Sequence, residues 1–352
     1  MKLEPLHSNN NIPPTKDGEK VPLGKSPLAM EMQELFGKRF KLDASIKRHT
    51  AARVGGAVDG LIEIHSLQEL EQTASILWQY QHPFLILGGG SNVLVSDAGV
   101  RAIVLINRAR QVHFDEVDGQ PVARAESGAN FGLVARLAAA RGLSGLEWAA
   151  GIPGTVGGAV FGNAGAHGAD MASNLLVADI LHQTRGWESW GVDRFGFAYR
   201  DSVLKRASKA GGPAYPTCPQ MVIMNAVFQL IRSSPKDVQS RMDELVAYRR
   251  HTQPPGASMG SMFKNPPGDY AGRLIEAAGL KGHQLGDVKI SDLHANFFIN
   301  LGQASAAEIY ELISLARETV FDKSGVKMDL EVELIGDWDI VADEGTVSSK
   351  QP

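Results

Sequence analysis

The alternation of apolar and polar residues near the start of the chain predicts a strand, a helix and a second strand. Residues 61–64 are apolar except for Glu63 and have the length of a short strand. Ser66 and Glu69 have the spacing of a helix capping box, and apolar residues follow them at helical intervals. Residues 83–87 are apolar throughout, which is typical of a strand covered on both faces. The loop 88–92 is therefore expected at the carboxyl end of a buried strand, where such units commonly bind ligands.

The middle of the chain combines one predicted helix with several predicted strands. The helix should begin after Asn130 and end at Gly142, because a glycine suits the C-terminal cap of a helix. A glycine-rich run at 151–168 lies among these elements, and we interpret it as a loop. The strands are expected at residues 102–106, 122–126, 177–181 and 221–230.

The last third of the chain predicts a mixture of helices and strands. Pro235 suits the first turn of one helix, and Ser305 with Glu308 has the spacing of a second capping box. A further helix is expected at 270–278, and strands are expected at 295–300 and 328–335. These patterns predict an α+β protein with three lobes, 29–94, 95–232 and 233–340, between flexible tails at 1–28 and 341–352.

Composition narrows the class of protein. The chain has 352 residues, of which 43% are hydrophobic, so it can bury the cores of two or three domains. A net charge of −4 leaves no basic footprint for nucleic acid. Cys218 is the one cysteine, which excludes a disulfide framework and a multi-cysteine metal site. The chain shows no signal-peptide core and no apolar stretch of bilayer length, so we expect a cytoplasmic protein without a membrane partner.

Two glycine-rich segments are candidates for binding a cofactor. Backbone N–H groups of 88–92 could wrap a phosphate, although a sharp turn would also require glycine. This segment does not satisfy the dinucleotide signature G-x-G-x-x-G, because position 93 is valine. Residues 151–165 are mostly small, which suits either a flat ring lying on the backbone or a close helix–sheet crossing.

Three polar residues could serve the hydride reduction of a double bond, which requires a cofactor, an acid and a stabilising charge. Ser261 is a candidate proton donor, although an ordinary loop serine would look the same. Arg200 could bind a substrate carboxylate or could pair with a neighbouring acid. Glu331 interrupts an apolar strand, which is also typical of a solvated strand edge. Lys264 and His294 carry no specific signal alone, and no metal-binding spacing is present.

The order of these segments resembles one family. Across residues 42–338 the chain carries HTAARVGG, GGGSN, GLEWAAGIPGTVGGAVFGNAGAHG, YRDS, GSMFKNP, AGRLIEAAGLKG, HANFFIN and LEVELIG. Together they resemble UDP-N-acetylenolpyruvoylglucosamine reductase, the FAD enzyme of peptidoglycan precursor synthesis. The resemblance implies a two-lobed FAD-binding domain of the vanillyl-alcohol oxidase/p-cresol methylhydroxylase type, followed by a C-terminal α+β substrate-binding domain at 233–340.

The family's chemistry would make NADPH the hydride donor to a non-covalently bound FAD. Flavin N5 would then pass the hydride to the enolpyruvyl group, giving UDP-N-acetylmuramate. By resemblance, Ser261 protonates the intermediate, and Glu331 and Arg200 stabilise it. The other partner would be a small UDP-linked amino sugar, and we expect a monomer without a metal.

The resemblance also implies the remaining binding residues. The substrate residues would be Tyr199, Lys264, Asn265, Lys281 and His294. The FAD residues would be Thr50, Arg53, Gly55, Gly88, Gly89, Gly90, Ser91, Asn92, Gly128, Ile152, Pro153, Gly154, Thr155, Gly157, Gly158 and Asn163.

Two features distinguish this chain from other members of the family. Glu333 occupies a position where many relatives carry arginine, so a flavin or phosphate contact is either lost or supplied elsewhere. The short stretch 230–261 resembles the branch that lacks an inserted tyrosine loop. Two other hypotheses stay open: a flavin enzyme of the same fold that oxidises an alcohol or hydroxy acid, and a non-enzymatic flavin- or nucleotide-sugar-binding regulator.

Overall fold

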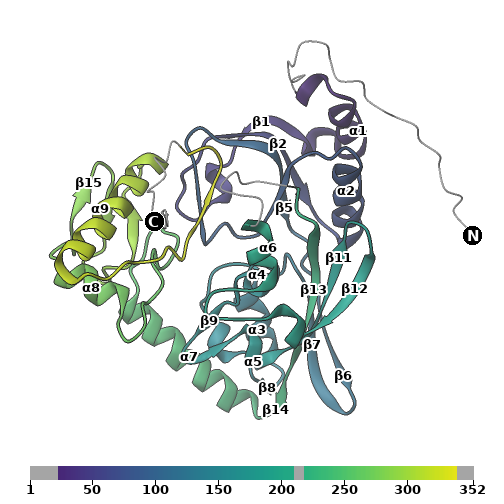
Figure 1. The fold of residues 1–352 in the computed structure, drawn as a ribbon. Coiled ribbons are helices and arrows are strands. Elements are labelled where there is room, and N and C mark those ends of the chain that lie inside the picture. The colour runs from purple at the N-terminus through teal and green to yellow at the C-terminus, as the bar shows by residue number, and fades with distance from the viewer. Residues whose placement is uncertain (1–22, 210–217, 339–352) are drawn as a thin grey trace, which may run out of the picture.

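The computed structural model of the protein describes residues 23–209 and 218–338, which fold as an α+β structure (Figure 1). Residues 23–28 were expected in a flexible tail, but they form a 3-10 turn, η1 (Leu23–Lys25), and begin α1 (Pro27–Phe36), whose Leu28 is buried. The rest of that tail and the C-terminal tail lie outside the described residues. Among the helices of the described ranges, none is both long and apolar enough to cross a membrane.

The first lobe is built on a four-stranded sheet of order β1-β2-β5-β3. Its strands are β1 (Lys41–Ser45), β2 (Ala57–Ile64), β3 (Phe84–Leu87) and β5 (Val100–Asn107). In β5, Ile103 and Leu105 face one apolar core while Val104 and Ile106 face another, so the sheet is buried on both faces as the apolar pattern predicted. The predicted lobe boundary at residue 95 is wrong, because β5 pairs with β2 and β3 in this sheet.

The helix α2 (Leu67–Gln79) confirms the predicted start at Ser66, whose hydroxyl accepts the N–H of Glu69 at 3.2 Å. The carboxylate of Glu69 does not return to Ser66. It accepts the N–H of His65 at 2.8 Å and pairs with Arg39 at 2.8 Å. The spacing of Ser66 and Glu69 therefore predicted the start of the helix correctly. In place of the return contact to Ser66 that would complete a capping box, the Glu69 carboxylate contacts His65 and Arg39.

The second lobe contains an antiparallel sheet of order β12-β11-β13-β7-β6. Its strands are β6 (Val112–Val117), β7 (Gln120–Glu126), β11 (Leu175–His182), β12 (Gly186–Gly191) and β13 (Met221–Gln229). Helix α3 (Phe131–Ala139) begins at Asn130 as predicted but is capped by Ala140, two residues before Gly142. The glycine run is not wholly a loop, since it contains α4 (Val156–Gly162), whose Val156 and Val160 are fully buried.

A long helix, α7 (Pro235–Thr252), joins the second lobe to the C-terminal domain (Figure 1). Val238 and Met242 pack against Ala139 and Ala150 of the second lobe. The predicted boundary at 233 is therefore wrong in packing terms, because this helix lies on the preceding lobe. The remaining short elements before it are β4 (Val93–Val95), β8 (Leu143–Ser144), β9 (Gly165–Ala166), β10 (Ala169–Asp170), α5 (Met171–Asn174), α6 (Val203–Lys209) and β14 (Ile231–Arg232).

The C-terminal domain packs two helices and a small sheet around an apolar core to which Ala52, Val54 and Leu94 of the first lobe also contribute. Its elements are α8 (Ala271–Ala277), β15 (Gln284–Leu285), β16 (Val288–Ile290), β17 (Phe298–Asn300), α9 (Ala306–Ser324) and β18 (Glu333–Ile335). Ser305 and Glu308 form the predicted capping box at the start of α9. The strands β17 and β18 are shorter than predicted, since they begin at Phe298 and Glu333.

The last strand returns to the first lobe. Strand β18 pairs in parallel with β4, with Glu333 opposite Val93. Because β4 follows directly after the glycine-rich segment 88–92, this pairing brings the end of the chain beside that segment.

Candidate active site

Three segments converge on what we call the glycine cradle, made of residues 50–55, 88–92 and 151–158. The N–H of Ala51 donates to the carbonyl of Gly90 at 2.9 Å. The hydroxyl of Ser91 donates to the carbonyl of Pro153 at 3.3 Å. The structure thus brings together the segments that the resemblance assigned to FAD.

Glycine is sterically required where these segments meet. A Cβ atom on Gly88 would lie 2.1 Å from Oγ1 of Thr155, and one on Gly90 would lie 2.1 Å from the carbonyl oxygen of His49. Real Cβ contacts do not reach such distances, so any side chain would push the segments apart. The glycines therefore allow the segments to approach closely, with Gly88 against the Thr155 side chain and Gly90 against the backbone of residues 49 and 50.

The first segment of the cradle is a tight loop. The Thr50 hydroxyl donates to the carbonyl of Val54 at 2.8 Å, and the same oxygen accepts the Val54 N–H at 3.2 Å. Arg53 and Gly55 both have positive φ, at 58° and 120°. The loop conformation is therefore held by Thr50, and the FAD roles of Thr50, Arg53 and Gly55 stay predictions.

The second lobe supplies the other wall of the cradle. The N–H of Val156 donates to Ala129 at 2.9 Å and the N–H of Gly157 to Ser127 at 2.8 Å. Between these partners lies Gly128, where an added Cβ would stand 2.5 Å from the carbonyl oxygen of Ala109. Gly128 is therefore closely packed against the carbonyl of Ala109, and its two chain neighbours bond to the segment 151–158. The assigned positions Gly89, Asn92, Ile152, Gly154 and Gly158 all lie within the cradle.

Asn163, also assigned to FAD by resemblance, has its side chain occupied within the protein. Its amide nitrogen donates to the carbonyl of Ala198 at 2.9 Å and to Asp170 at 3.2 Å, and its amide oxygen accepts the N–H of Ala172 at 3.3 Å. The structure therefore gives this side chain a role in holding the loop that leads to Arg200.

Arg200 and Glu331, both assigned to catalysis by the resemblance, lie far apart in sequence but form an ion pair, which we call the reactive pair. Nε of Arg200 lies 2.8 Å from Oε1 of Glu331, and the two side chains are 25% and 13% exposed. The Nε atom is buried, and the two groups form an ion pair. Arg200 has φ of 56°, a left-handed conformation that costs about 1–3 kcal/mol for a non-glycine residue. Such strain is typical of functional sites.

Burial raises the pKa of the Glu331 carboxyl above its ordinary value, because a carboxylate loses hydration inside the protein. The charges of Arg200, Lys205 and Lys264 oppose this shift without cancelling it. Glu331 is therefore not at a solvated strand edge, which was the ordinary interpretation of its sequence pattern. It is a carboxyl group that holds a proton more readily than a free glutamate.

Ser261 lies on a segment joined to Glu331 by backbone hydrogen bonds. The N–H of Glu331 donates to the carbonyl of Met262 at 2.9 Å. The Asn296 side chain clamps the same segment, since its oxygen accepts the Phe263 N–H at 2.9 Å and its nitrogen donates to the Phe263 carbonyl at 2.8 Å. The sequence did not single out Asn296, and only its place in HANFFIN pointed to it.

Lys205 is a second residue that sequence reasoning missed. Its side chain is 5% exposed, and Nζ lies 2.6 Å from Oε1 of Glu333 and 3.1 Å from the carbonyl oxygen of Arg200. Ser202 orders this turn, because its hydroxyl accepts the Lys205 N–H at 3.2 Å and donates to Phe161 at 2.6 Å. The signal in the sequence was a lysine three residues after Ser202, directly after Val203 and Leu204.

This lysine also shows how the chain accommodates Glu333. The unexpected carboxylate meets a buried ammonium group from the second lobe. The pair therefore joins the segment that carries Glu331 and Glu333 to the loop that carries Arg200.

The positions assigned to substrate differ in what surrounds them. Tyr199 is 55% exposed, with the Arg200 guanidinium 5.8 Å from its ring centre. Lys264 acts on Glu331 through its charge. The oxygen of Asn265 accepts the Ala271 N–H at 3.1 Å, so it caps α8.

Lys281 and His294 lie near each other in the C-terminal domain. Lys281 pairs with Glu276 at 2.8 Å. Burial lowers the pKa of His294, and the charge of Lys281 lowers it further. Among the described residues, no group of three or more histidine, cysteine, aspartate and glutamate side chains is placed to hold a metal.

Comparison with known proteins places this geometry in a family. Residues 58–185 match the FAD binding domain model, and residues 251–335 match the model for the C-terminal domain of UDP-N-acetylenolpyruvoylglucosamine reductase. The reductase of Rubrobacter xylanophilus is 40% identical over 306 residues, which cover 87% of this chain and 98% of the relative. The chain belongs to the UDP-N-acetylenolpyruvoylglucosamine reductase family.

Other members agree with this assignment. The reductase of Bacillus subtilis is 39% identical over 310 residues, which cover 87% of this chain and 97% of the relative. The crystal structure of the Thermus caldophilus reductase matches with a TM-score of 0.69 and 33% identity, over 84% of this chain and 98% of that one. The chain is therefore an FAD-dependent oxidoreductase with a FAD-binding domain of the vanillyl-alcohol oxidase/p-cresol methylhydroxylase type.

Proposed function

We propose that the chain uses NADPH to reduce the enolpyruvyl group of UDP-N-acetyl-3-O-(1-carboxyvinyl)glucosamine, giving UDP-N-acetylmuramate for peptidoglycan precursor synthesis. One observation carries the proposal: the glycine cradle and the reactive pair are joined through Asn92. Its side chain donates to the carbonyl of Glu331 at 3.1 Å, and its own carbonyl accepts the Glu333 N–H at 3.0 Å. A group held in the cradle would therefore lie beside the reactive pair.

The cradle fits a flavin. Gly88 and Gly90 have no room for side chains of their own, and glycine backbone can approach a diphosphate or a flat ring closely. Bound FAD supplies the hydride at its N5 position. The segments 50–55, 88–92 and 151–158 would hold it without a covalent bond.

Arg200 serves as the stabilising charge. Addition of hydride to the enolpyruvyl double bond leaves negative charge that is delocalised onto the substrate carboxylate. A guanidinium group has five donors in a rigid fork, so Arg200 can contact Glu331 through Nε and still present its other nitrogens to that carboxylate. The buried setting strengthens this interaction because water is not there to screen it.

Ser261 delivers the proton to the carbon next to the one that accepts hydride. A serine hydroxyl is a weak acid, so its role depends on position, and the Met262 and Asn296 hydrogen bonds fix its segment. Glu331 stabilises the intermediate from the same side of the site. Burial raises the pKa of its carboxyl, so Glu331 holds a proton more readily than a free glutamate does.

The UDP part of the substrate would be held by the C-terminal domain. Lys281 and His294 supply the cationic and hydrogen-bonding groups for its diphosphate, and Tyr199, Lys264 and Asn265 lie closer to the reactive pair. Replacement of Lys281 by alanine should raise the KM for the UDP sugar more than it lowers kcat, because the interaction is the same in ground and transition states.

Anaerobic stopped-flow absorbance of the two half-reactions tests the proposal. The wild-type protein should be yellow, should bleach with NADPH and should regain colour with the enolpyruvyl nucleotide. Ser261→Ala should leave bleaching within about twofold and slow reoxidation by about 10²–10⁴-fold, the range for loss of a general acid. Ser314→Ala on α9, whose hydroxyl bonds within its own helix, is the matched control. Equal slowing of both half-reactions in Ser261→Ala would remove the proton-donor assignment.

A further inference from the structure

Asn300, the last residue of the HANFFIN segment, is a buried polar side chain that has no part in the proposed function so far. It is 7% exposed and ends β17 in the C-terminal domain. Its amide oxygen accepts the N–H groups of Gly302 at 2.7 Å and Ala304 at 3.1 Å. Its amide nitrogen donates to the carbonyl of Ala52 at 2.8 Å. The oxygen thus faces two donors and the nitrogen faces an acceptor, which fixes the orientation of the amide.

The bond from Asn300 to Ala52 joins the C-terminal domain to the glycine cradle. Ala52 belongs to the cradle segment 50–55 of the first lobe and is 1% exposed, so the contact is shielded from water. The same segment is tied to the next one, because the N–H of Ala51 donates to the carbonyl of Gly90. Loss of a hydrogen bond between buried polar groups is costly, since water does not replace the missing partner. The cradle therefore has a direct and buried connection to the C-terminal domain.

The backbone of Asn300 holds the segment that carries Ser261. This segment lies antiparallel to the end of HANFFIN, with Ala257 opposite Asn300 and Ser261 opposite Phe297. The Asn300 N–H donates to the carbonyl of Ala257 at 2.9 Å. One residue therefore contacts the cradle through its side chain and the Ser261 segment through its backbone.

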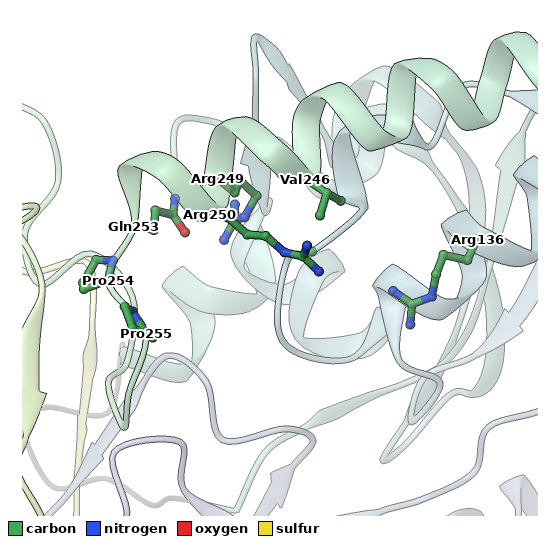
Figure 2. Close-up of a pocket in the computed structure, with 8 residues that line it drawn as sticks. Arg136, Val246, Arg249, Arg250, Gln253, Pro254 and Pro255 are labelled. Atoms are coloured by element: carbon green, nitrogen blue, oxygen red, sulfur yellow. The ribbon is translucent and has the colours of Figure 1, made fainter.

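The chain approaches the Ser261 segment from the end of α7. Figure 2 shows Gln253, Pro254 and Pro255 there, directly after the helix. Proline restricts φ and has no backbone N–H, so these two residues stiffen the connection but donate no hydrogen bond that could anchor it. The bond between Ala257 and Asn300 follows two residues later and fixes this part of the segment to the C-terminal domain.

We propose that Asn300 is a positioning residue for the reduction, because it sets the Ser261 segment at a fixed place relative to the cradle that holds the flavin. This inference rests on the proposed function, since it concerns the proton donor of that reaction. A shift at Asn300 would move Ser261 relative to the cradle without removing either. A misplacement of about 1 Å at a reacting group can slow a reaction by about 100-fold.

The kinetic test uses Asn300→Asp, which has a similar shape, keeps an oxygen for Gly302 and Ala304, and removes the donor to Ala52. With FAD in excess and saturating UDP sugar, reoxidation of the reduced flavin should slow by about 10–100-fold. The substrate Kd should stay within about threefold, because Lys281 and His294 are unchanged. Asn300→Ala should slow reoxidation at least as much. A wild-type rate in Asn300→Asp, with a loss only in Asn300→Ala, would mean that the side chain merely orders its own turn and would overturn the proposal.

Ser305→Ala is the matched control, because it removes a hydrogen bond within the same domain, the one that its hydroxyl accepts from the Glu308 N–H at 3.0 Å. Loss of this helix cap should lower Tm by about 2–4 °C. It leaves the contact with Ala52 intact, so reoxidation should stay within about twofold of wild type. If Asn300→Asp does not fold or binds no FAD, Asn300→Ala takes its place beside the control. Equal slowing in Asn300→Ala and Ser305→Ala would assign the effect to stability and overturn the proposal.

Amide hydrogen exchange separates this inference from the proposed function, because it needs no substrate. In FAD-loaded Asn300→Asp, protection of the Val54 N–H in the cradle segment should fall by about tenfold or more, while the Ala304 N–H stays protected. Ser305→Ala should leave the Val54 N–H unchanged. If the enolpyruvyl nucleotide does not reoxidise the wild-type flavin, the proposed function fails, and the exchange still decides whether Asn300 holds the cradle segment. Wild-type protection of Val54 in both Asn300 variants would overturn the inference.

Discussion

The glycine cradle and the reactive pair lie next to each other but are specified by opposite means. The cradle depends on missing side chains: at Gly88 and Gly90 an added Cβ would lie 2.1 Å from another segment. The reactive pair depends on charged side chains, since Arg200 meets Glu331 and Lys205 meets Glu333 in a largely buried setting. A side chain added at Gly88 or Gly90 should disrupt the cradle, whereas removal of a charged side chain should disrupt the reactive pair. Substitutions should therefore damage the two regions in distinguishable ways.

The largest effect is expected at Glu331. Glu331→Gln removes the ionisable carboxyl partner of Arg200, so reoxidation by the enolpyruvyl substrate should slow by about 10³-fold. Bleaching by NADPH should change by less than about threefold, because the glycine cradle is left intact. Single-turnover absorbance measures both rates, and Glu318→Gln on the exposed face of α9 is the control. Equal loss in both half-reactions would place Glu331 in flavin reduction instead.

The next effect is expected at Gly90. Gly90→Ala adds a Cβ against the His49 carbonyl at a residue with φ of 58°, so the first two cradle segments must separate. We expect loss of most bound FAD and a fall in stability of about 2–3 kcal/mol. Flavin content and thermal unfolding check this prediction. Gly191→Ala is the control, because nothing lies within 4 Å of its added Cβ. A yellow, fully loaded Gly90→Ala protein would contradict the account of the cradle.

A smaller effect is expected at Lys205, which we regard as a positioning residue. Lys205→Met releases the Arg200 carbonyl and removes the ammonium group that contacts Glu333, so reoxidation should slow by about 10–100-fold with little change in NADPH bleaching. Loss of this positive charge should raise the pKa of Glu331 further, so the acid limb of the reoxidation profile should move to higher pH.

Lys205→Arg, which keeps the charge, should recover much of that rate and return the acid limb toward its original position. If Lys205→Met instead lowers stability without moving the pH profile, the lysine is purely structural.

The smallest effect concerns stability against pH. The pKa of Glu331 is raised in the folded protein above its ordinary value of 4.5, so the folded state keeps a proton that the unfolded state releases. Its contribution to stability is therefore present below that ordinary value and is lost as pH rises through the folded pKa. The Glu331→Gln side chain does not ionise, so the variant does not lose this contribution. Its free energy of unfolding relative to wild type should therefore increase with pH between 4.5 and the raised pKa of the folded protein. Urea unfolding at a series of pH values and fixed FAD would measure it; a difference that shrinks with rising pH would contradict the raised pKa.

Local features of the fold were predictable from sequence. The starts of α2, α3 and α9 follow from hydrogen bonds at Ser66, Asn130 and Ser305 that span three residues. Pairings between distant segments were not predictable. Strand β5 inserts between β2 and β3, and α4 forms in the glycine run because burial of Val156 and Val160 outweighs the low helix propensity of glycine.

In the candidate site too, local patterns could be recognised in the sequence, whereas contacts between distant segments could not. Its residues were named through the family resemblance, since the pattern around Glu331 alone predicted a solvated edge. Lys205 was missed because its partner, Glu333, arrives from the other end of the chain through the β18–β4 pairing. Long-range charge pairing leaves no periodic signal in a sequence, whereas a helix cap does.

The most direct test is a crystal structure of the FAD-loaded protein with the enolpyruvyl nucleotide bound. The account predicts the flavin in the glycine cradle, the substrate carboxylate on Arg200, and the Ser261 hydroxyl within about 3–3.5 Å of the vinyl carbon on the face opposite the flavin. A complex in which that hydroxyl points away from the vinyl group, or in which Arg200 contacts no part of the substrate, would contradict it.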